Sequence, residues 1–245
     1  MSAESTTAQR NRSSAILQRL RKAYPDARCA LDHENPLQLL VATILSAQCT
    51  DARVNRVTPA LFERYPTVED YADSDRDELE QRVHSTGFYR NKAKAIHGAA
   101  AKIVSDYGGI VPQTMDELLT LPGVARKTAN AVLGNAFGIA SGVVVDTHVF
   151  RLSHRMGLVE AKTAEKVEAK LIELVPRAEW IDTSHLMIHH GRAVCPARAP
   201  QCDACLVEAL CPKLGVAPRK AKPPDPPKTP LAARIAAAKK KTRTK

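Results

Sequence analysis

The chain lacks an apolar run long enough to span a membrane, and its first twelve residues are largely polar, without the apolar core of a secretion signal. The longest apolar stretch, residues 37–45, is interrupted by Gln38 and Thr43. There is no convincing strand pattern and no internal repeat. We therefore expect a cytoplasmic enzyme that has no membrane partner.

The net charge of +10 is concentrated at the end of the chain. Residues 216–245 hold ten Lys and Arg side chains against one acid, Asp225, which leaves a charge of only +1 for the rest of the chain. This tail is rich in Pro and Ala, and we expect it to be disordered. Two roles stay open for it: raising non-specific DNA affinity through counterion release, or acting as a solubilising extension.

Helical periodicity and helix-capping residues run through most of the chain, which predicts an all-α fold. Asn35-Pro36 has the form of an N-cap followed by proline at the first helical position. Asp51 and Thr58-Pro59 are expected to begin two short helices, and Asp146 to cap another. Further helices are expected over residues 13–24, 75–84, 91–107, 164–174 and 183–190, the last of them closed by Gly191.

A short helix, a Pro-Gly turn and a second helix follow one another in the middle of the chain. Thr114 and Glu117 have the spacing of a capping box for the first helix, which stops at Pro122-Gly123. The second helix is expected over residues 126–137, and its unpaired N-terminal amides suit a phosphate. Lys127 falls in the first turn of that helix. Two interpretations stay open: a plain turn with a solvated lysine, or a clamp on the DNA backbone that also presents an amine.

Four of the six cysteines lie within seventeen residues and have the spacing C-x6-C-x2-C-x5-C: Cys195, Cys202, Cys205 and Cys211. Cys29 and Cys49 stand apart and are expected to be ordinary buried thiols. Because nothing marks the chain as secreted, disulfides are disfavoured, and we expect the four thiolates to surround one metal centre. Zinc and an iron–sulfur cluster both accept four thiolates, and the spacing leaves that choice open. The loop over residues 196–201 would place Arg198 where it could meet a phosphate.

Three motifs occur in the same order as in the endonuclease III family of DNA-repair glycosylases, which the chain therefore resembles: LPGVARKTA at 121–129, VDTHVFR at 145–151 and the cysteine spacing. Two further segments, SAQCTD at 46–51 and GFYRNKA at 87–93, are similar to other motifs of that family. The resemblance covers roughly residues 13–213. It implies two helical domains flanking a cleft that binds double-stranded DNA with a damaged base or an abasic site, in a protein expected to be a monomer.

The resemblance also implies a [4Fe–4S] cluster on the four grouped cysteines. The implied division of the chain is a polar leader (1–12), a six-helix domain (29–140) containing the helix-hairpin-helix unit (114–138), a cluster domain formed by residues 13–28 together with 141–215, and a basic tail (216–245). Paired histidines at 189 and 190, with His185 before them, are expected on a helix surface or in a core rather than on a metal.

Lys127 would be the nucleophile, as the resemblance implies, attacking C1′ of a flipped nucleotide, expelling the damaged base and forming a Schiff base. β-Elimination would then cleave the strand 3′ to the abasic sugar, so that the expected enzyme is a bifunctional glycosylase and AP lyase acting on oxidised or ring-saturated pyrimidines. An amine is nucleophilic only when unprotonated, and a helix N-terminus and burial both favour its neutral form. Asp146 is the expected partner, because a carboxylate stabilises positive charge on the sugar and can also cap the following helix.

A base inside a duplex is inaccessible, so the enzyme must extrude it and fill the hole. The resemblance implies that Gln48 fills the hole left by the extruded base and that Phe88 wedges into the base stack. Without the resemblance, Gln48 would be interpreted as a polar residue at a helix end and Phe88 as a core aromatic. The other expected DNA contacts are Leu121, Gly123, Ala125, Arg126, His148 and Arg198. Ala125 stands where a second glycine is common in the family, and its Cβ is expected to weaken or tilt the phosphate contact.

Three alternatives stay open on the sequence alone. A monofunctional mismatch or adenine glycosylase of the same superfamily generally lacks a lysine at the position of Lys127, and adenine-specific relatives carry an extra C-terminal domain. A non-catalytic DNA-binding module would not need both Lys127 and Asp146. An electron-transfer protein would account for the cysteines but not for the hairpin.

Overall fold

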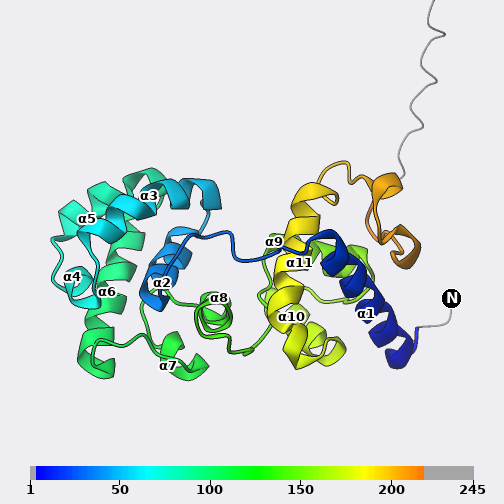
Figure 1. The fold of residues 1–245 in the computed structure, drawn as a ribbon, viewed down its shortest axis with the longest axis horizontal. Helices are drawn as coiled ribbons and strands as arrows, with labels where there is room; N and C mark the ends of the chain where they lie inside the picture. Colours follow the sequence, from blue (N-terminus) through cyan, green and yellow to red (C-terminus); the bar gives the residue numbers. More distant parts are fainter. Residues whose placement is uncertain (1–3, 218–245) are drawn as a thin grey trace, which may run out of the picture. The chain divides into compact units, whose positions relative to one another are not determined.

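The computed structural model describes residues 4–217, which form eleven α-helices and four short 3-10 helices and contain no strand (Figure 1). The predicted all-α class is therefore confirmed. The α-helices are α1 (Thr6–Ala23), α2 (Pro36–Leu45), α3 (Asp51–Arg64), α4 (Val68–Ala72), α5 (Arg76–Val83), α6 (Tyr89–Tyr107), α7 (Met115–Leu119), α8 (Arg126–Phe137), α9 (Thr147–Arg155), α10 (Ala164–Leu174) and α11 (Trp180–Ala193). The 3-10 helices are η1 (His84–Thr86), η2 (Arg177–Glu179), η3 (Cys202–Ala204) and η4 (Glu208–Leu210).

Two hydrophobic core clusters organise these helices. The first contains buried side chains from residues 31–133, and we call residues 29–140 the hairpin region. The second combines three buried residues of α1 with side chains from residues 143–207. Figure 1 shows α1, at the start of the chain, beside α10 and α11, which it contacts. The chain therefore leaves the second core after α1 and returns to it only after the hairpin region is complete.

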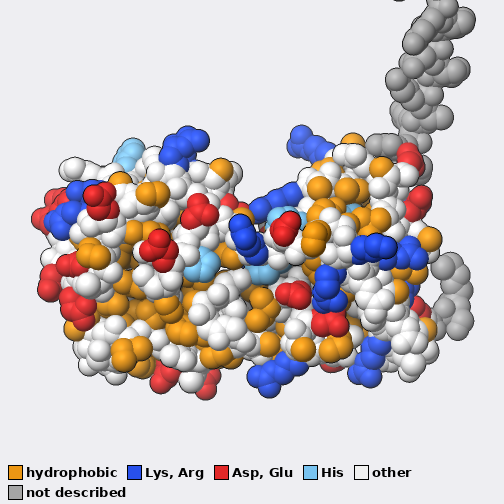
Figure 2. Space-filling view, in the orientation of Figure 1, with side chains coloured by type: hydrophobic (Ala, Val, Ile, Leu, Met, Phe, Trp, Pro, Cys, Tyr) orange, Lys and Arg blue, Asp and Glu red, His pale blue; other side chains and the backbone are white. Residues whose placement is uncertain are grey.

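Side chains of both charge signs are interspersed over the visible face (Figure 2). This distribution agrees with the small net charge counted outside the tail. The basic tail predicted over residues 216–245 lies almost entirely outside the described residues. Across residues 4–217, no helix is long and apolar enough to cross a membrane.

Capping side chains begin several helices where the sequence predicts them. Asn35 Oδ1 accepts a hydrogen bond of 3.0 Å from the N–H of Gln38 at the start of α2, and Asp146 caps α9. At the start of α7, the Thr114 hydroxyl accepts from the N–H of Glu117. The Glu117 carboxylate accepts from the Thr114 hydroxyl rather than from its backbone N–H, so only half of the predicted capping box forms.

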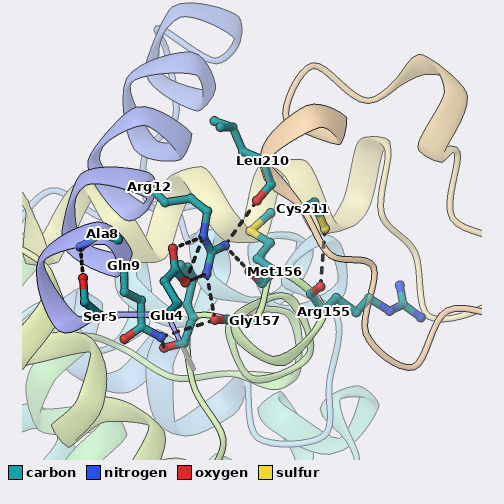
Figure 3. A network of polar contacts seen from close by, with 11 residues as sticks. Glu4, Ser5, Ala8, Gln9, Arg12, Arg155, Met156, Gly157, Leu210 and Cys211 are labelled. Carbon is teal, nitrogen blue, oxygen red and sulfur yellow. Dashed lines mark hydrogen bonds and ion pairs between the residues drawn. The ribbon is translucent and has the colours of Figure 1, made fainter. Parts of the chain in front are cut away.

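The helix predicted to begin at Ser13 begins at Thr6, so much of the predicted polar leader is helical. Polar side chains, rather than apolar ones, hold this additional stretch (Figure 3). Gln9 and Arg12 donate hydrogen bonds to the backbone carbonyl oxygens of residues 156–158. The periodicity of apolar residues cannot predict this first part of α1, because polar side chains rather than apolar ones attach it to the rest of the fold.

Two other helix predictions are wrong. Thr58-Pro59 does not begin a helix, because α3 starts after its cap at Thr50 and continues through Pro59. α11 passes through Gly191 instead of ending there. A Cβ on Gly191 would lie 2.7 Å from Nδ1 of His148, so this glycine is needed for the close approach of α11 to α9.

The short helix α4 has no counterpart in the sequence prediction, and it raises the number of α-helices in residues 29–140 to seven instead of six. It begins with a full capping box, in which the Thr67 hydroxyl accepts from the N–H of Asp70 and the Asp70 carboxylate accepts from the N–H of Thr67. Its two buried residues, Val68 and Tyr71, are too few to show helical periodicity.

Candidate active site

Pro122 and Gly123 fix the turn between α7 and α8. The N–H of Val124 donates to the carbonyl of Leu121 at 3.1 Å, and Gly123 has φ of 77°, the pattern of a type II turn. A Cβ on Gly123 would lie 2.5 Å from the Cβ of Ala95, so the turn packs closely on α6. Leu121, a predicted DNA contact, is 2% exposed, and its side chain anchors the turn.

The N-terminus of α8 has no side-chain cap. Ala125 is the N-cap residue and offers no side-chain acceptor, so the first amides of the helix have no partner among residues 4–217. Lys127 is exposed, and its Nζ makes no hydrogen bond or ion pair in the described part of the chain. The burial predicted for Lys127 is therefore absent.

Arg126 donates to Glu168 of α10 through two of its five N–H groups. Its Nε and Nη2 lie 2.9 and 3.1 Å from the two carboxylate oxygens, and Asn130 Nδ2 donates to the same carboxylate at 2.8 Å. Glu168 is only 5% exposed while Arg126 is exposed, so this bidentate pair is a partly buried link between α8 and α10. It fixes the residue directly before Lys127, in addition to any contact with DNA.

Lys127 and Asp146 come together in the structure. Both line two adjoining pockets of about 120 and 520 Å³, which also share Ser46, Asp51 and Arg192. Arg192 Nη2 donates to Asp51 Oδ2 at 2.5 Å, which links α11 to the start of α3. An amine and a carboxylate therefore share one concave site.

Asp146 has one carboxylate oxygen that is committed and one that is available. Oδ1 accepts from the N–H groups of His148 and Val149, both at 2.8 Å, as the N-cap of α9. Oδ2 accepts no hydrogen bond within residues 4–217. Capping and chemistry can thus use different oxygens of the same side chain.

His148 lines the larger pocket, next to the predicted pair. Burial lowers the pKa of His148, and the positive charges of Arg151 and Arg192 also lower it, while Asp146 raises it. Arg151 Nη2 lies 3.1 Å from Nδ1 of the ring, so the neutral ring accepts there and carries its proton on Nε2.

Gln48 and Phe88 share an uncommon backbone conformation. Their φ angles are 52° and 49°, in the left-handed region that is costly for residues other than glycine. Among the described residues, Ala199 and Lys213 are the other non-glycine residues with positive φ. Gln48 is exposed and Phe88 is 63% exposed, so Phe88 is not a core aromatic.

We call residues 194–217 the cysteine segment, which contains two 3-10 helices, η3 and η4, and no α-helix. Its four cysteines are free and partly buried. Burial raises the pKa of Cys205 and Cys211, and the charges of neighbouring cysteines raise it further. In the described part of the chain, no three His, Cys, Asp or Glu side chains are grouped as they would be around one metal ion.

Arg155 holds the loop at the start of the cysteine segment. Its Nη1 donates to Cys195 Sγ at 3.3 Å and to the carbonyl of Pro196 at 2.7 Å. Its Nη2 donates to the carbonyl of Ala197 at 2.8 Å. Arg198, the predicted phosphate contact, is exposed on this loop.

His190 is the buried histidine of the predicted trio. Its Nε2 lies 3.4 Å from Cys205 Sγ, and its Nδ1 lies 3.1 Å from the Tyr24 hydroxyl. The ring is 0% exposed, and burial lowers the pKa of His190 to about 4. It is therefore a core residue that also contacts a cysteine sulfur.

Several pocket residues have no marker in the sequence. His185 Nε2 lies 2.7 Å from Asn135 Oδ1, and both residues line the smaller pocket. His185 lies in α11 and Asn135 in α8, so no spacing in the sequence predicts this contact. Cys29 and Cys49, expected to be buried thiols, are only partly buried and line the smaller and larger pocket respectively.

Comparison with known proteins identifies a family and several relatives that this chain resembles. Residues 41–177 match the family described as HhH-GPD superfamily base excision DNA repair protein. Endonuclease III of Synechocystis sp. is 59% identical over 203 residues, which cover 83% of this chain and 93% of that protein. Endonuclease III of Bacillus subtilis is 47% identical over 196 residues, 80% of this chain and 89% of that protein. A solved structure of a trapped endonuclease III–DNA covalent intermediate matches with a TM-score of 0.80 and 46% identity, covering 83% of this chain and 96% of its own.

Proposed function

The chain belongs to the endonuclease III family of base-excision DNA repair proteins, as a DNA glycosylase and AP lyase, and we propose that Lys127 and Asp146 carry out its chemistry. The observation that carries the proposal is the concave site that these two residues line together. Lys127 Nζ has no partner in residues 4–217, and Asp146 keeps Oδ2 available. The amine and the carboxylate oxygen are therefore not used elsewhere in the described fold.

The reaction begins when a damaged nucleotide leaves the duplex and its sugar reaches the site. The neutral amine of Lys127 attacks C1′ as the bond to the base breaks, and the departing base takes the bonding electron pair and a proton. Asp146 stabilises the positive charge that develops on the sugar. The sugar ring then opens to give a Schiff base between Nζ and C1′. Loss of a C2′ proton expels the 3′ phosphate, and water releases the lysine.

DNA binding would use Gln48 and Phe88, which are both exposed with left-handed backbone, and the uncapped end of α8. Gln48 fills the hole left by the extruded nucleotide, and Phe88 enters the stack beside it. A backbone phosphate binds the unpaired amides at the start of α8, near Ala125, where the helix dipole favours negative charge. His148 and Arg198 add further contacts. The substrate is double-stranded DNA with an oxidised or ring-saturated pyrimidine or an abasic site, at the chromosome, bound by one copy of the chain.

The cysteine segment would hold a [4Fe–4S] cluster through Cys195, Cys202, Cys205 and Cys211. Four free, partly buried thiols within seventeen residues are the right ligand type and number for four iron–thiolate bonds, and Arg155 donates to the sulfur of Cys195. Four thiolates would also hold a single zinc ion, and the choice of the iron–sulfur cluster rests on the family resemblance. When bound, the cluster supplies four cross-links to a segment with little secondary structure. The residues of the excision reaction lie elsewhere.

Borohydride trapping on a duplex with one oxidised pyrimidine tests the assignment. We expect a covalent adduct with the unaltered protein, none with Lys127→Ala, and an adduct as before with Lys162→Ala, which changes an exposed lysine outside the site. Asp146→Asn keeps an oxygen for the α9 cap and should lower base excision by roughly 100-fold or more. Excision without an adduct would assign a monofunctional glycosylase, and binding without excision of any lesion would assign a docking module.

A further inference from the structure

Lys92, in the first turn of α6, is a buried lysine that has no carboxylate partner within residues 4–217. It is 4% exposed, and its Nζ donates to the carbonyl of Leu45 at 2.8 Å and to the carbonyl of Thr86 at 2.7 Å. Burial lowers the pKa of Lys92. Burying an ammonium group is costly unless hydrogen bonds compensate, so this contact is a specific feature of the fold rather than a solvated side chain.

The two acceptors are equivalent positions in two separate helices. Leu45 is the last residue of α2, and Thr86 is the last residue of η1. Carbonyls in a last helical turn have no partner within the helix, and they lie at the negative end of its dipole. Within residues 4–217, no other group donates to either carbonyl. One amine therefore ties the ends of two helices together.

One tied helix end leads directly into Gln48 and the other into Phe88, and both residues are exposed with left-handed backbone. Gln48 follows Leu45 after two intervening residues, and Phe88 follows Thr86 after one. Such a backbone conformation is costly for residues other than glycine and persists only where the surroundings over-determine it. Lys92 adds a third constraint, because its own N–H donates to the carbonyl of Phe88 at 3.1 Å.

We propose that Lys92 is a positioning residue that fixes the separation of Gln48 and Phe88, so that both enter the duplex together around one extruded nucleotide. The inference rests on the proposed function, in which these two residues insert into DNA. The loops that carry Gln48 and Phe88 are held together before DNA binds, so they do not lose independent conformational freedom on insertion. This lowers the entropic cost of entering the duplex. Lys92 itself does not touch the DNA.

The test separates insertion from chemistry by using two substrates. Lys92→Met keeps the length of the side chain and removes its donors. We expect kcat/KM for excision from a duplex with one thymine glycol to fall about 10- to 100-fold, the size of effect that a small misplacement produces. Strand cleavage of a single-stranded oligonucleotide with one abasic site should stay within about twofold, because there is no stack to enter and Lys127 is unchanged.

Two control variants exclude trivial explanations. Lys94→Met makes the same chemical change at an exposed position of α6 and should leave both activities unchanged. Ile103→Ala opens a cavity at a fully buried position of the same helix and lowers the unfolding temperature without touching either loop. With assays kept well below every unfolding midpoint, it should not separate the two activities.

Amide hydrogen exchange without DNA provides a readout that is independent of activity. Lys92→Met should speed exchange in the peptides that cover residues 46–50 and 86–89, and not in the turn at Gly123. An equal fall on both substrates, no fall on either, or exchange that rises evenly along the chain would each overturn the positioning role. If the unaltered protein fails to cleave the abasic oligonucleotide, the proposed function is wrong, and the exchange data still decide whether Lys92 holds both loops.

Discussion

The hairpin region and the cysteine segment keep their shapes by different physical means. Apolar side chains fill the core of the hairpin region, and Gly123 lets its turn pack on α6. In the cysteine segment, Val207 is the one fully buried apolar residue among those described. Arginines from other elements hold the segment instead: Arg155 at the carbonyls of residues 196 and 197, Arg19 at residue 206 and Arg12 at residue 210. A packed core spreads the cost of one substitution, whereas such a segment depends on individual contacts.

Arg155→Met should produce the largest effect, because it removes three hydrogen bonds at once from the segment with the least apolar burial. We expect the free energy of unfolding to fall by about 2–5 kcal/mol, since carbonyls are left without donors. Arg19→Met is the matched control, because Arg19 donates only one such bond, at 3.1 Å and exposed, and should cost less than about 1 kcal/mol. Denaturant unfolding measures both variants, and equal losses would contradict the contrast.

Gly123→Ala should give the next largest effect and should act on the hairpin region. Positive φ costs about 1–2 kcal/mol for alanine, and the contact with Ala95 adds overpacking of about 1–3 kcal/mol. Gly138→Ala is the control, because its φ is 68° but a Cβ there would meet nothing within 4 Å. We expect thermal unfolding to show the greater loss for Gly123→Ala, together with weaker DNA binding. Equal losses would mean that the close approach to α6 contributes nothing.

Titration of His185 should give the smallest effect, at the contact between α11 and α8. Burial lowers the pKa of His185. As the pH falls below about 6.5, the His185 ring is therefore protonated in the unfolded chain before it is protonated in the folded one. The contribution of the neutral ring to the free energy of unfolding is complete above that pH and is lost as the pH falls through the pKa of His185 in the folded protein. His185→Gln should make the free energy of unfolding less dependent on pH between pH 7.5 and 5. An unchanged slope in denaturant titrations at each pH would contradict this assignment.

Features that depend on neighbouring residues could be predicted from the sequence. Asn35 and Asp146 cap their helices through bonds to amides two or three residues ahead, so the residue type and its place before a helix carry the signal. The four grouped cysteines are visible by spacing alone. The pairing of Lys127 with Asp146 needed the family resemblance, because nothing local connects two residues from different helices.

Features that depend on distant partners could not be predicted. Arg126 with Glu168, His185 with Asn135 and Lys92 with two carbonyls join elements far apart in the chain, and such contacts leave no periodic pattern. The exposure of Lys127 was missed for a related reason. The sequence predicts that Lys127 lies in the first turn of a helix, but whether its side chain is buried depends on tertiary packing.

The placement of α1 in the second core has a consequence for the order of synthesis. α1 leaves the ribosome first, yet the side chains it packs against belong to residues made after the hairpin region. That region can condense while α1 still waits, and joining α1 to α10 and α11 then closes a long loop, which is slow compared with local folding. A nascent chain interrupted before α10 would carry a completed hairpin region beside an uncovered apolar helix, a target for chaperones and proteases.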